Sequence, residues 1–144
     1  MLSSPLGGRE HNISKQKAEK GLTDWVFWHK KAPQYQMKGV YQQADFFLLP
    51  TEYEIFGMVL LEAMFFRRVV LTTPNGGADM LLRSGENGIV LEKSDPARWA
   101  EALLDVAADP AKKARMEQAA YETVIHENTW DALADRFLKV YEKR

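Results

Sequence analysis

The chain has 144 residues, of which 46% are hydrophobic and 27% are charged, and its formal net charge is −1. This length and composition fit one globular domain with a sizeable core, and the balanced charge gives no electrostatic reason to expect nucleic acid or an anionic membrane as the main partner. The absence of cysteine excludes disulfides and thiolate metal sites and favours a cytoplasmic setting.

The first part of the chain is predicted to contain two helices and one short strand. Residues 1–8 end in a glycine pair and are expected to form a loop, and the polar run 9–20 predicts a helix that Gly21 stops. The aromatic run 25–28 predicts a strand, and a turn is expected at residues 29–33. Residues 34–43 fit an exposed helix with Met37, Val40 and Tyr41 on one face.

The middle of the chain alternates apolar runs with helical patterns. Residues 46–49, 69–71 and 89–91 predict short buried strands, and the first of these is apolar on both faces, as in a central parallel strand. A helix is expected from about 57 to 66. Another, beginning near Gly77, is expected to carry Met80 and Leu81 inward, and the glycines of residues 84–88 predict a turn.

Three helices without glycine are predicted to close the chain. The Asp-Pro pairs at 95–96 and 109–110 each combine an N-cap residue with proline at the first helical position, which predicts helices at 96–108 and 110–126. Thr129 is expected to cap a final helix with apolar residues at helical spacing: Trp130, Leu133, Ala134, Phe137 and Tyr141. The whole pattern favours an α/β fold, a Rossmann-like parallel sheet of about four strands with helices on both faces.

Such a sheet binds ligands beyond the carboxyl ends of its strands, and Glu54 follows one of them. The helix that Gly57 precedes begins with N–H groups that lack intrahelical partners, so the backbone of Phe56, Gly57 and Met58 could face a diphosphate. Glu62 is the one charged residue of the apolar run 58–66. Because a carboxylate accepts two hydroxyls at once, Glu62 suits the diol of a ribose and Glu54 suits a sugar.

Each of these residues also has a plainer interpretation. Glu54 alone is more often a solvated loop residue, and Glu62 could pair with Arg67, with Arg68 or with a backbone donor. Gly76–Gly77 alone is more often a turn than a ligand contact, and Lys30 and Lys31 fit a solvated turn. The four tryptophans are expected to pack in the core or at its edge: Trp25, Trp28, Trp99 and Trp130.

The run from Pro50 to Met64, PTEYEIFGMVLLEAM, closely resembles the E-x7-E motif of retaining GT-B glycosyltransferases. The likeness is to the glycosyl transferases group 1, which include bacterial polysaccharide and lipopolysaccharide transferases. Further segments stand in the family's order: Ala44-Asp45, Val69-Val70, Gly76-Gly77, residues 85–88 and the final helix at 130–141. The resemblance extends back to about Gly7.

This resemblance implies that the chain is the C-terminal, nucleotide-sugar-binding half of a two-domain enzyme. It implies that Glu54, as the catalytic residue, contacts the donor sugar, and that Glu62 contacts the ribose hydroxyls. The main-chain donors of Phe56, Gly57 and Met58 would hold the diphosphate. Transfer would retain the anomeric configuration, with no metal or other cofactor, and positive groups and helix dipoles would stabilise the leaving diphosphate.

Residues 1–144 are therefore expected to form a single donor-binding domain that lacks its first strands and the N-terminal acceptor domain, and to show little or no transfer activity alone. The family's phosphate-binding Arg and Lys would precede Met1. The Lys30 region replaces a glycine near the nucleotide base, and Gly7–Gly8 stand where the family has a glycine loop.

Two alternatives stay open. One is a non-catalytic Rossmann-like module that binds a nucleotide or a partner, and the other is a structural α/β domain that packs on a second subunit. An exposed apolar sheet edge where the first strands are missing would favour such self-association in the second case. The expected location is cytoplasmic, and for a full-length enzyme a peripheral position at the inner face of a membrane is compatible with it.

Overall fold

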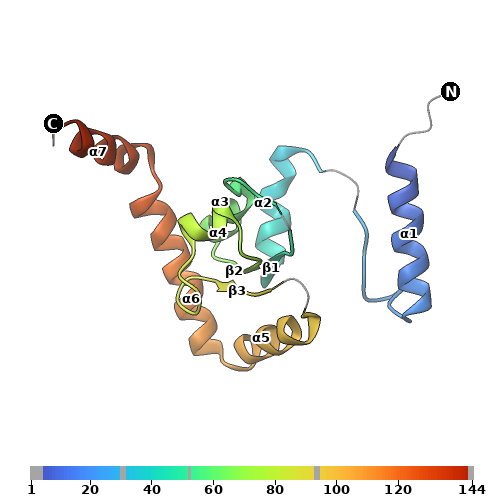
Figure 1. Cartoon of the computed structure of the whole chain (residues 1–144). Coiled ribbons are helices and arrows are strands. Elements are labelled where there is room, and N and C mark those ends of the chain that lie inside the picture. Colours follow the sequence, from blue (N-terminus) through green and yellow to red (C-terminus); the bar gives the residue numbers. More distant parts are fainter. Residues whose placement is uncertain (1–4, 30–31, 52, 93–94, 143–144) are drawn as a thin grey trace. The chain divides into compact units, whose positions relative to one another are not determined.

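The computed structural model describes residues 5–29, 32–51, 53–92 and 95–142, which belong to two compact units, residues 1–37 and 38–144 (Figure 1). The helix α2 crosses the boundary between them. The elements in chain order are α1 (Pro5–Glu19), α2 (Gln34–Gln43), β1 (Phe46–Leu49), α3 (Met58–Phe65), β2 (Val69–Thr72), α4 (Gly76–Leu81), β3 (Ile89–Val90), α5 (Pro96–Ala108), α6 (Pro110–Glu122), the π-helix η1 (Thr123–Glu127) and α7 (Trp130–Tyr141).

The first unit contains a longer helix than the sequence predicts. The helix α1 begins at Pro5, so Gly7 and Gly8 lie within it rather than in a loop. Proline suits the first turn of a helix, where its missing N–H leaves no bond unmade. At the other end Gly21 adopts φ 64° and stops the helix, as predicted: the Leu22 N–H donates to Lys17 O at 2.8 Å and the Gly21 N–H to Ala18 O at 3.2 Å.

The predicted strand at residues 25–28 is wrong. The backbone there is irregular, and the N–H groups of Trp25 and Val26 both donate to Leu22 O, at 3.1 and 3.0 Å. The Trp25 and Trp28 side chains are 81% and 48% exposed, so neither packs in a core. A strand requires a neighbouring strand for its hydrogen bonds. In this segment the two N–H groups instead close a turn onto the carbonyl oxygen of Leu22. Lys30 and Lys31 lie outside the described residues.

The second unit is built on a parallel sheet of three described strands in the order β1-β2-β3. The register pairs Phe46 with Val69 and Leu71 with Ile89. The central strand is β2, whose four residues are all buried, whereas β1 lies at the edge of the described sheet and leaves Leu48 44% exposed. The sequence pattern therefore locates the strands but errs in their number and in making residues 46–49 central.

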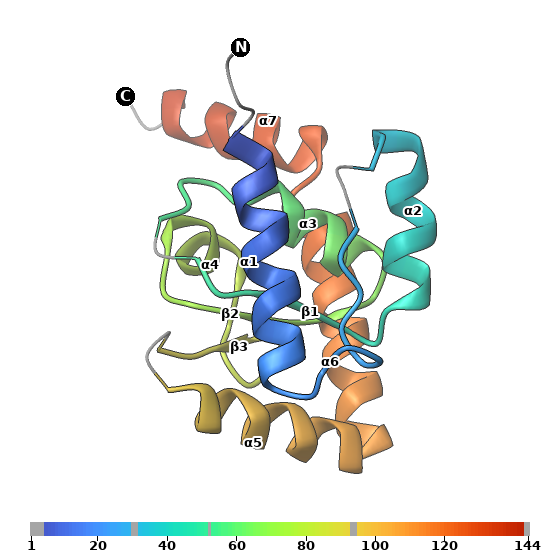
Figure 2. The same cartoon turned by 90° about the vertical axis from the view of Figure 1, so that its right-hand side faces the viewer.

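Helices cover both faces of this sheet. Val69 and Leu71 project from one face into a core with Trp99 and Val106 of α5 and Met116 of α6. Side chains alternate along a strand, so Val70 points to the other face, where α3 and α4 lie (Figures 1 and 2). The helix α3 buries Leu60, Ala63 and Met64 completely, which accounts for its almost wholly apolar sequence.

The C-terminal helices begin where the sequence predicts. Asp95, Asp109 and Thr129 each cap a helix, with side-chain oxygens that accept hydrogen bonds from the backbone N–H groups of Arg98, Lys112 and Ala132. The helix α7 buries none of its side chains, and Trp130 is 87% exposed. Trp99 alone among the four tryptophans is in the core, with its Nε1–H donating to Glu92 O at 2.9 Å.

In α4 Leu81 points inward, as predicted, but Met80 is 65% exposed, because the short helix turns only one face to the protein. The turn at residues 84–88 is confirmed, with Gly85 at φ 88°. Within the described ranges, no helix combines the length and the apolar character needed to cross a bilayer.

Candidate functional site

The candidate site lies at the carboxyl ends of β1 and β2, where parallel α/β sheets bind their ligands. Two buried threonines join the two strand ends. Thr72 Oγ1 donates to Leu49 O at 2.9 Å, and Thr73 Oγ1 donates to Thr51 O. The first bond lies at the last pair of the ladder and the second lies beyond it, so together they hold the start of the β1–α3 loop against the end of β2.

Glu54 ties this loop to two neighbouring segments. Its carboxylate Oε1 accepts the N–H of Gly57 at 3.1 Å, and its carbonyl oxygen accepts the N–H of Gly76 at 3.1 Å. The residue is half-buried. Glu54 is therefore a hydrogen-bonded part of the loop rather than a solvated residue, and it folds the loop back onto the start of α3.

Gly57 is the N-cap of α3 and has φ 71° and ψ 51°, a left-handed conformation that glycine adopts without strain. A Cβ atom at this position would also lie 2.8 Å from Leu60 Cδ1. The neighbouring side chains of Phe56 and Met58 are 38% and 60% exposed. Of the three main-chain donors expected at the helix start, Gly57 thus already directs its N–H to an anionic group, the Glu54 carboxylate.

The pair Gly76–Gly77 packs directly on this loop. A Cβ atom on Gly76 would lie 2.5 Å from Ile55 O, and one on Gly77 would lie 2.5 Å from Phe56 O. Real Cβ atoms essentially never approach a heavy atom this closely, so both positions require glycine. The glycine pair opens α4 behind its N-cap Asn75, whose Oδ1 accepts the Ala78 N–H at 2.9 Å.

Glu62 lies four residues into α3, about 6 Å along the helix axis from Met58. It is half-buried, and its Oε2 accepts a hydrogen bond from the Tyr41 hydroxyl at 3.0 Å. Burial of the Tyr41 ring, together with the hydrogen bond to Glu62 and the charge of Glu62, raises the pKa of Tyr41 well above its usual range. Sequence reasoning placed Tyr41 on one face of an exposed helix with Met37 and Val40, and it did not connect Tyr41 with Glu62.

Arg67 and Arg68, the alternative partners for Glu62, bind elsewhere. The Arg67 guanidinium donates to Gln118 Oε1 at 2.6 Å, and the Arg68 guanidinium donates to Ala44 O at 2.6 Å. Arg67, which follows the C-cap Phe66 of α3, has φ 56°, a left-handed conformation that favours glycine.

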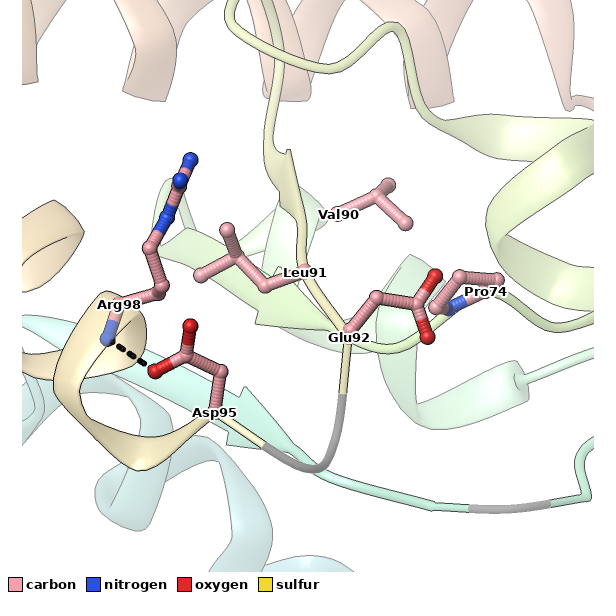
Figure 3. A pocket seen from close by; sticks show the side chains of 6 residues that line it. All are labelled: Pro74, Val90, Leu91, Glu92, Asp95 and Arg98. Atoms are coloured by element: carbon pink, nitrogen blue, oxygen red, sulfur yellow. Dashed lines mark hydrogen bonds between the residues drawn. The ribbon is translucent and has the colours of Figure 1, made fainter.

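A cavity of about 340 Å³ opens beyond β2 and β3, and sequence reasoning did not identify it. Pro74 follows β2 and Glu92 follows β3, while Asp95 and Arg98 belong to the start of α5; Val90 and Leu91 complete the lining. Figure 3 shows the Arg98 and Glu92 side chains on either side of Leu91, and the Arg98 backbone N–H donating to Asp95 Oδ1 at 3.0 Å. The cavity offers one guanidinium and two carboxylates beside an apolar wall.

Metal ligands do not gather in the described part of the chain: no three His, Asp or Glu side chains there are placed to hold an ion.

Comparison with known proteins connects this arrangement to a family. The family described as "Glycosyl transferases group 1" matches residues 6–123. The D-inositol 3-phosphate glycosyltransferase of Thermomonospora curvata is 32% identical over 146 aligned residues, which cover 98% of this chain and 33% of that protein. The chain thus spans about a third of the length of this relative.

Solved structures share the fold. The C-terminal domain of a glycosyl transferase group 1 family protein from Francisella tularensis aligns with a TM-score of 0.78 at 21% identity, over 88% of this chain and 66% of that one. Anabaena Alr3699/HepE, solved in complex with UDP-glucose, aligns with a TM-score of 0.74 at 20% identity, over 93% of this chain and 36% of that one. The described sheet and helices therefore match the C-terminal domain of a GT-B glycosyltransferase.

Proposed function

The chain belongs to the glycosyl transferases group 1 family, and from this premise we propose that it is the donor-binding domain of an enzyme that transfers sugar from a nucleotide diphosphate to an acceptor. We propose that residues 1–144 supply the donor-binding part of such an enzyme, since the chain spans about a third of the length of its glycosyltransferase relative. The acceptor would be a polysaccharide, a lipopolysaccharide or a related glycoconjugate, and the enzyme would act in the cytoplasm. The nucleotide-sugar complex of the Anabaena neighbour supports the choice of donor class.

The observation that carries the proposal is the hydrogen bond between the Gly57 N–H and the Glu54 carboxylate at the start of α3. A backbone N–H that holds a carboxylate oxygen at 3.1 Å can hold a phosphate oxygen in the same way, since both are anionic acceptors. In the proposal the N–H groups of Phe56, Gly57 and Met58 bind the diphosphate. The positive end of the α3 dipole would also stabilise the negative charge that the diphosphate carries as it leaves.

The two glutamates take different parts of the donor in this proposal. Glu54, beside the helix start, contacts the transferred sugar. Glu62, about 6 Å further along α3, accepts the ribose hydroxyls. Transfer with retention, and without a resident metal or cofactor, belongs to the proposal on the strength of the E-x7-E resemblance.

The proposal is tested by calorimetric titration of the protein with UDP, GDP and ADP. The Glu62→Ala variant is expected to bind the preferred nucleotide about 10- to 100-fold more weakly, because charge-assisted hydrogen bonds contribute about 1.5–3 kcal/mol. Glu101→Ala, which removes an exposed glutamate from α5, serves as the control and is expected to bind like the wild type. Equal affinities of wild type and Glu62→Ala would rule out the ribose assignment.

One observation favours a non-catalytic alternative. The Glu54 carboxylate has a structural role as the acceptor for Gly57 N–H, so it does not require a substrate to explain its presence. The two functions differ in the effect of Glu54→Ala on sugar transfer, measured in a protein that also carries the acceptor domain. Loss of transfer with retained nucleotide binding supports the catalytic assignment, whereas intact transfer supports the binding module.

A further inference from the structure

We infer that Tyr41 is a positioning residue, which orients the Glu62 carboxylate toward the ribose hydroxyls of a nucleoside diphosphate. This inference rests on the proposed function and adds to it a residue outside the β1–α3 segment. It comes from the contact between the two side chains, which lie 21 positions apart in the sequence and on different helices.

The Tyr41 ring is held firmly by its surroundings. It is only 3% exposed, although the other described residues of α2 are half-buried or exposed. The ring stacks on Phe66 with centroids 5.5 Å apart and planes 15° from parallel, and it meets Phe47 at 5.8 Å with a tilt of 54°. A ring fixed on two sides by β1 and by the end of α3 has one direction in which its hydroxyl can point.

That hydroxyl points at Glu62. The 3.0 Å hydrogen bond engages one carboxylate oxygen, Oε2, and so restricts rotation about the side-chain bonds of Glu62. A carboxylate that is already ordered loses less freedom when it accepts two hydroxyls of a ribose, and the binding is stronger by that difference. The phenol lies in a buried setting where its proton is retained, so it acts as a donor throughout the ordinary pH range.

A different role for the same contact would be structural, a bond that merely ties α2 to α3. The two roles predict different ligand dependence. A structural bond affects every nucleotide equally through the stability of the domain. A positioning bond affects only ligands that carry the ribose diol, because only these meet the Glu62 carboxylate.

The experiment compares each of UDP, GDP and ADP with its 2′,3′-dideoxy counterpart by calorimetric titration. The wild type is expected to prefer the diol at least tenfold, and Glu62→Ala is expected to abolish this preference. Tyr41→Phe, which removes only the hydroxyl oxygen, is expected to reduce the preference about 3- to 10-fold while affinity for the dideoxy nucleotide stays unchanged. Tyr121→Phe, which removes a hydroxyl from a half-buried ring that packs on Phe65, is the matched control and is expected to keep the full preference.

The outcomes separate the inference from the proposed function. If Tyr41→Phe leaves the preference intact, or weakens both nucleotides equally, the positioning role is wrong while the ribose assignment of Glu62 stands. If Glu62→Ala retains the preference, or the wild type shows none, the ribose assignment fails and the inference fails with it. Should Tyr41→Phe not fold, the preference is measured instead for Tyr41→Met, which fills the apolar space without a donor group, and a preference equal to that of the wild type would overturn the inference.

Discussion

Replacing Gly77 with alanine is predicted to displace the loop that carries the proposed diphosphate donors. The new Cβ atom would lie 2.5 Å from Phe56 O and 2.8 Å from Phe56 C, whereas ordinary contacts begin at 3.4 Å. Both of these atoms belong to the backbone, so no side-chain rotation can relieve the contact. The loop and the start of α4 must therefore separate by about 0.9 Å.

The expected cost is that of an overpacked core position, about 1–3 kcal/mol of unfolding free energy. For a chain of this length that corresponds to a fall of roughly 4–12 °C in Tm. The same displacement moves the Phe56 backbone, and a misplacement of about 1 Å in a binding group weakens binding or catalysis by up to roughly 100-fold. Stability and nucleotide affinity should therefore fall together.

Thermal and urea unfolding, followed by titration with a nucleoside diphosphate, check this prediction. Gly39→Ala is the matched control, because a Cβ atom on Gly39 meets nothing within 4 Å and the residue lies inside α2. That substitution is expected to stabilise the protein by about 0.5–1 kcal/mol. If Gly77→Ala were as stable as Gly39→Ala and bound nucleotide equally well, the close-packing account would be refuted.

Two further predictions concern stability away from the site. Asn87 is 1% exposed, and its Nδ2 group donates to Leu81 O at 3.0 Å and to Thr123 Oγ1 at 2.9 Å. Asn87→Ala should therefore lower the free energy of unfolding, measured in urea, by about 2–4 kcal/mol. A decrease of less than about 1 kcal/mol would contradict this. The hydrogen bond from Lys113, and then its charge, lowers the pKa of Asp45. A lowered carboxyl pKa stabilises the fold fully above the unfolded pKa and stops doing so as pH falls through the folded pKa. The stability difference between wild type and Asp45→Asn should therefore begin to shrink below about pH 4 and disappear once the pH is below the lowered pKa of Asp45. A difference that is unchanged between pH 7 and pH 2.5 would exclude this contribution.

Features of the fold that depend only on residues close together in the sequence could be predicted from the sequence. The Asp-Pro pairs at 95–96 and 109–110 mark helix starts because capping is a bond within four residues. The apolar runs at 46–49, 69–71 and 89–91 mark strands because a parallel strand must be buried on both faces. The run at 25–28 is also apolar and rich in strand-favouring residues, yet it forms no strand, because strand formation depends on a partner strand that composition does not reveal.

Around the predicted site residues, the local chain geometry could be predicted from the sequence, but the contacts between distant residues could not. The spacing of Glu54, Gly57 and Glu62 points to a helix start flanked by carboxylates, and the structure has that local arrangement. The bond from Tyr41 to Glu62 and the packing of Gly77 on Phe56 join residues about 20 positions apart. Such contacts follow from how α2 and α4 pack on α3, which a local pattern does not specify.

The bond between Glu54 and Gly57 has a consequence for the affinity of any anion at this helix start. The one hydrogen of the Gly57 N–H is already bonded to the Glu54 carboxylate, so a phosphate oxygen at this helix start would compete with that carboxylate for it. Phosphate therefore competes with an acceptor tethered three residues away, and its net gain is the difference between two charge-assisted hydrogen bonds. In the proposed function the displaced carboxylate would then accept hydroxyl groups of the transferred sugar, the uncharged part of the donor, rather than face the phosphate.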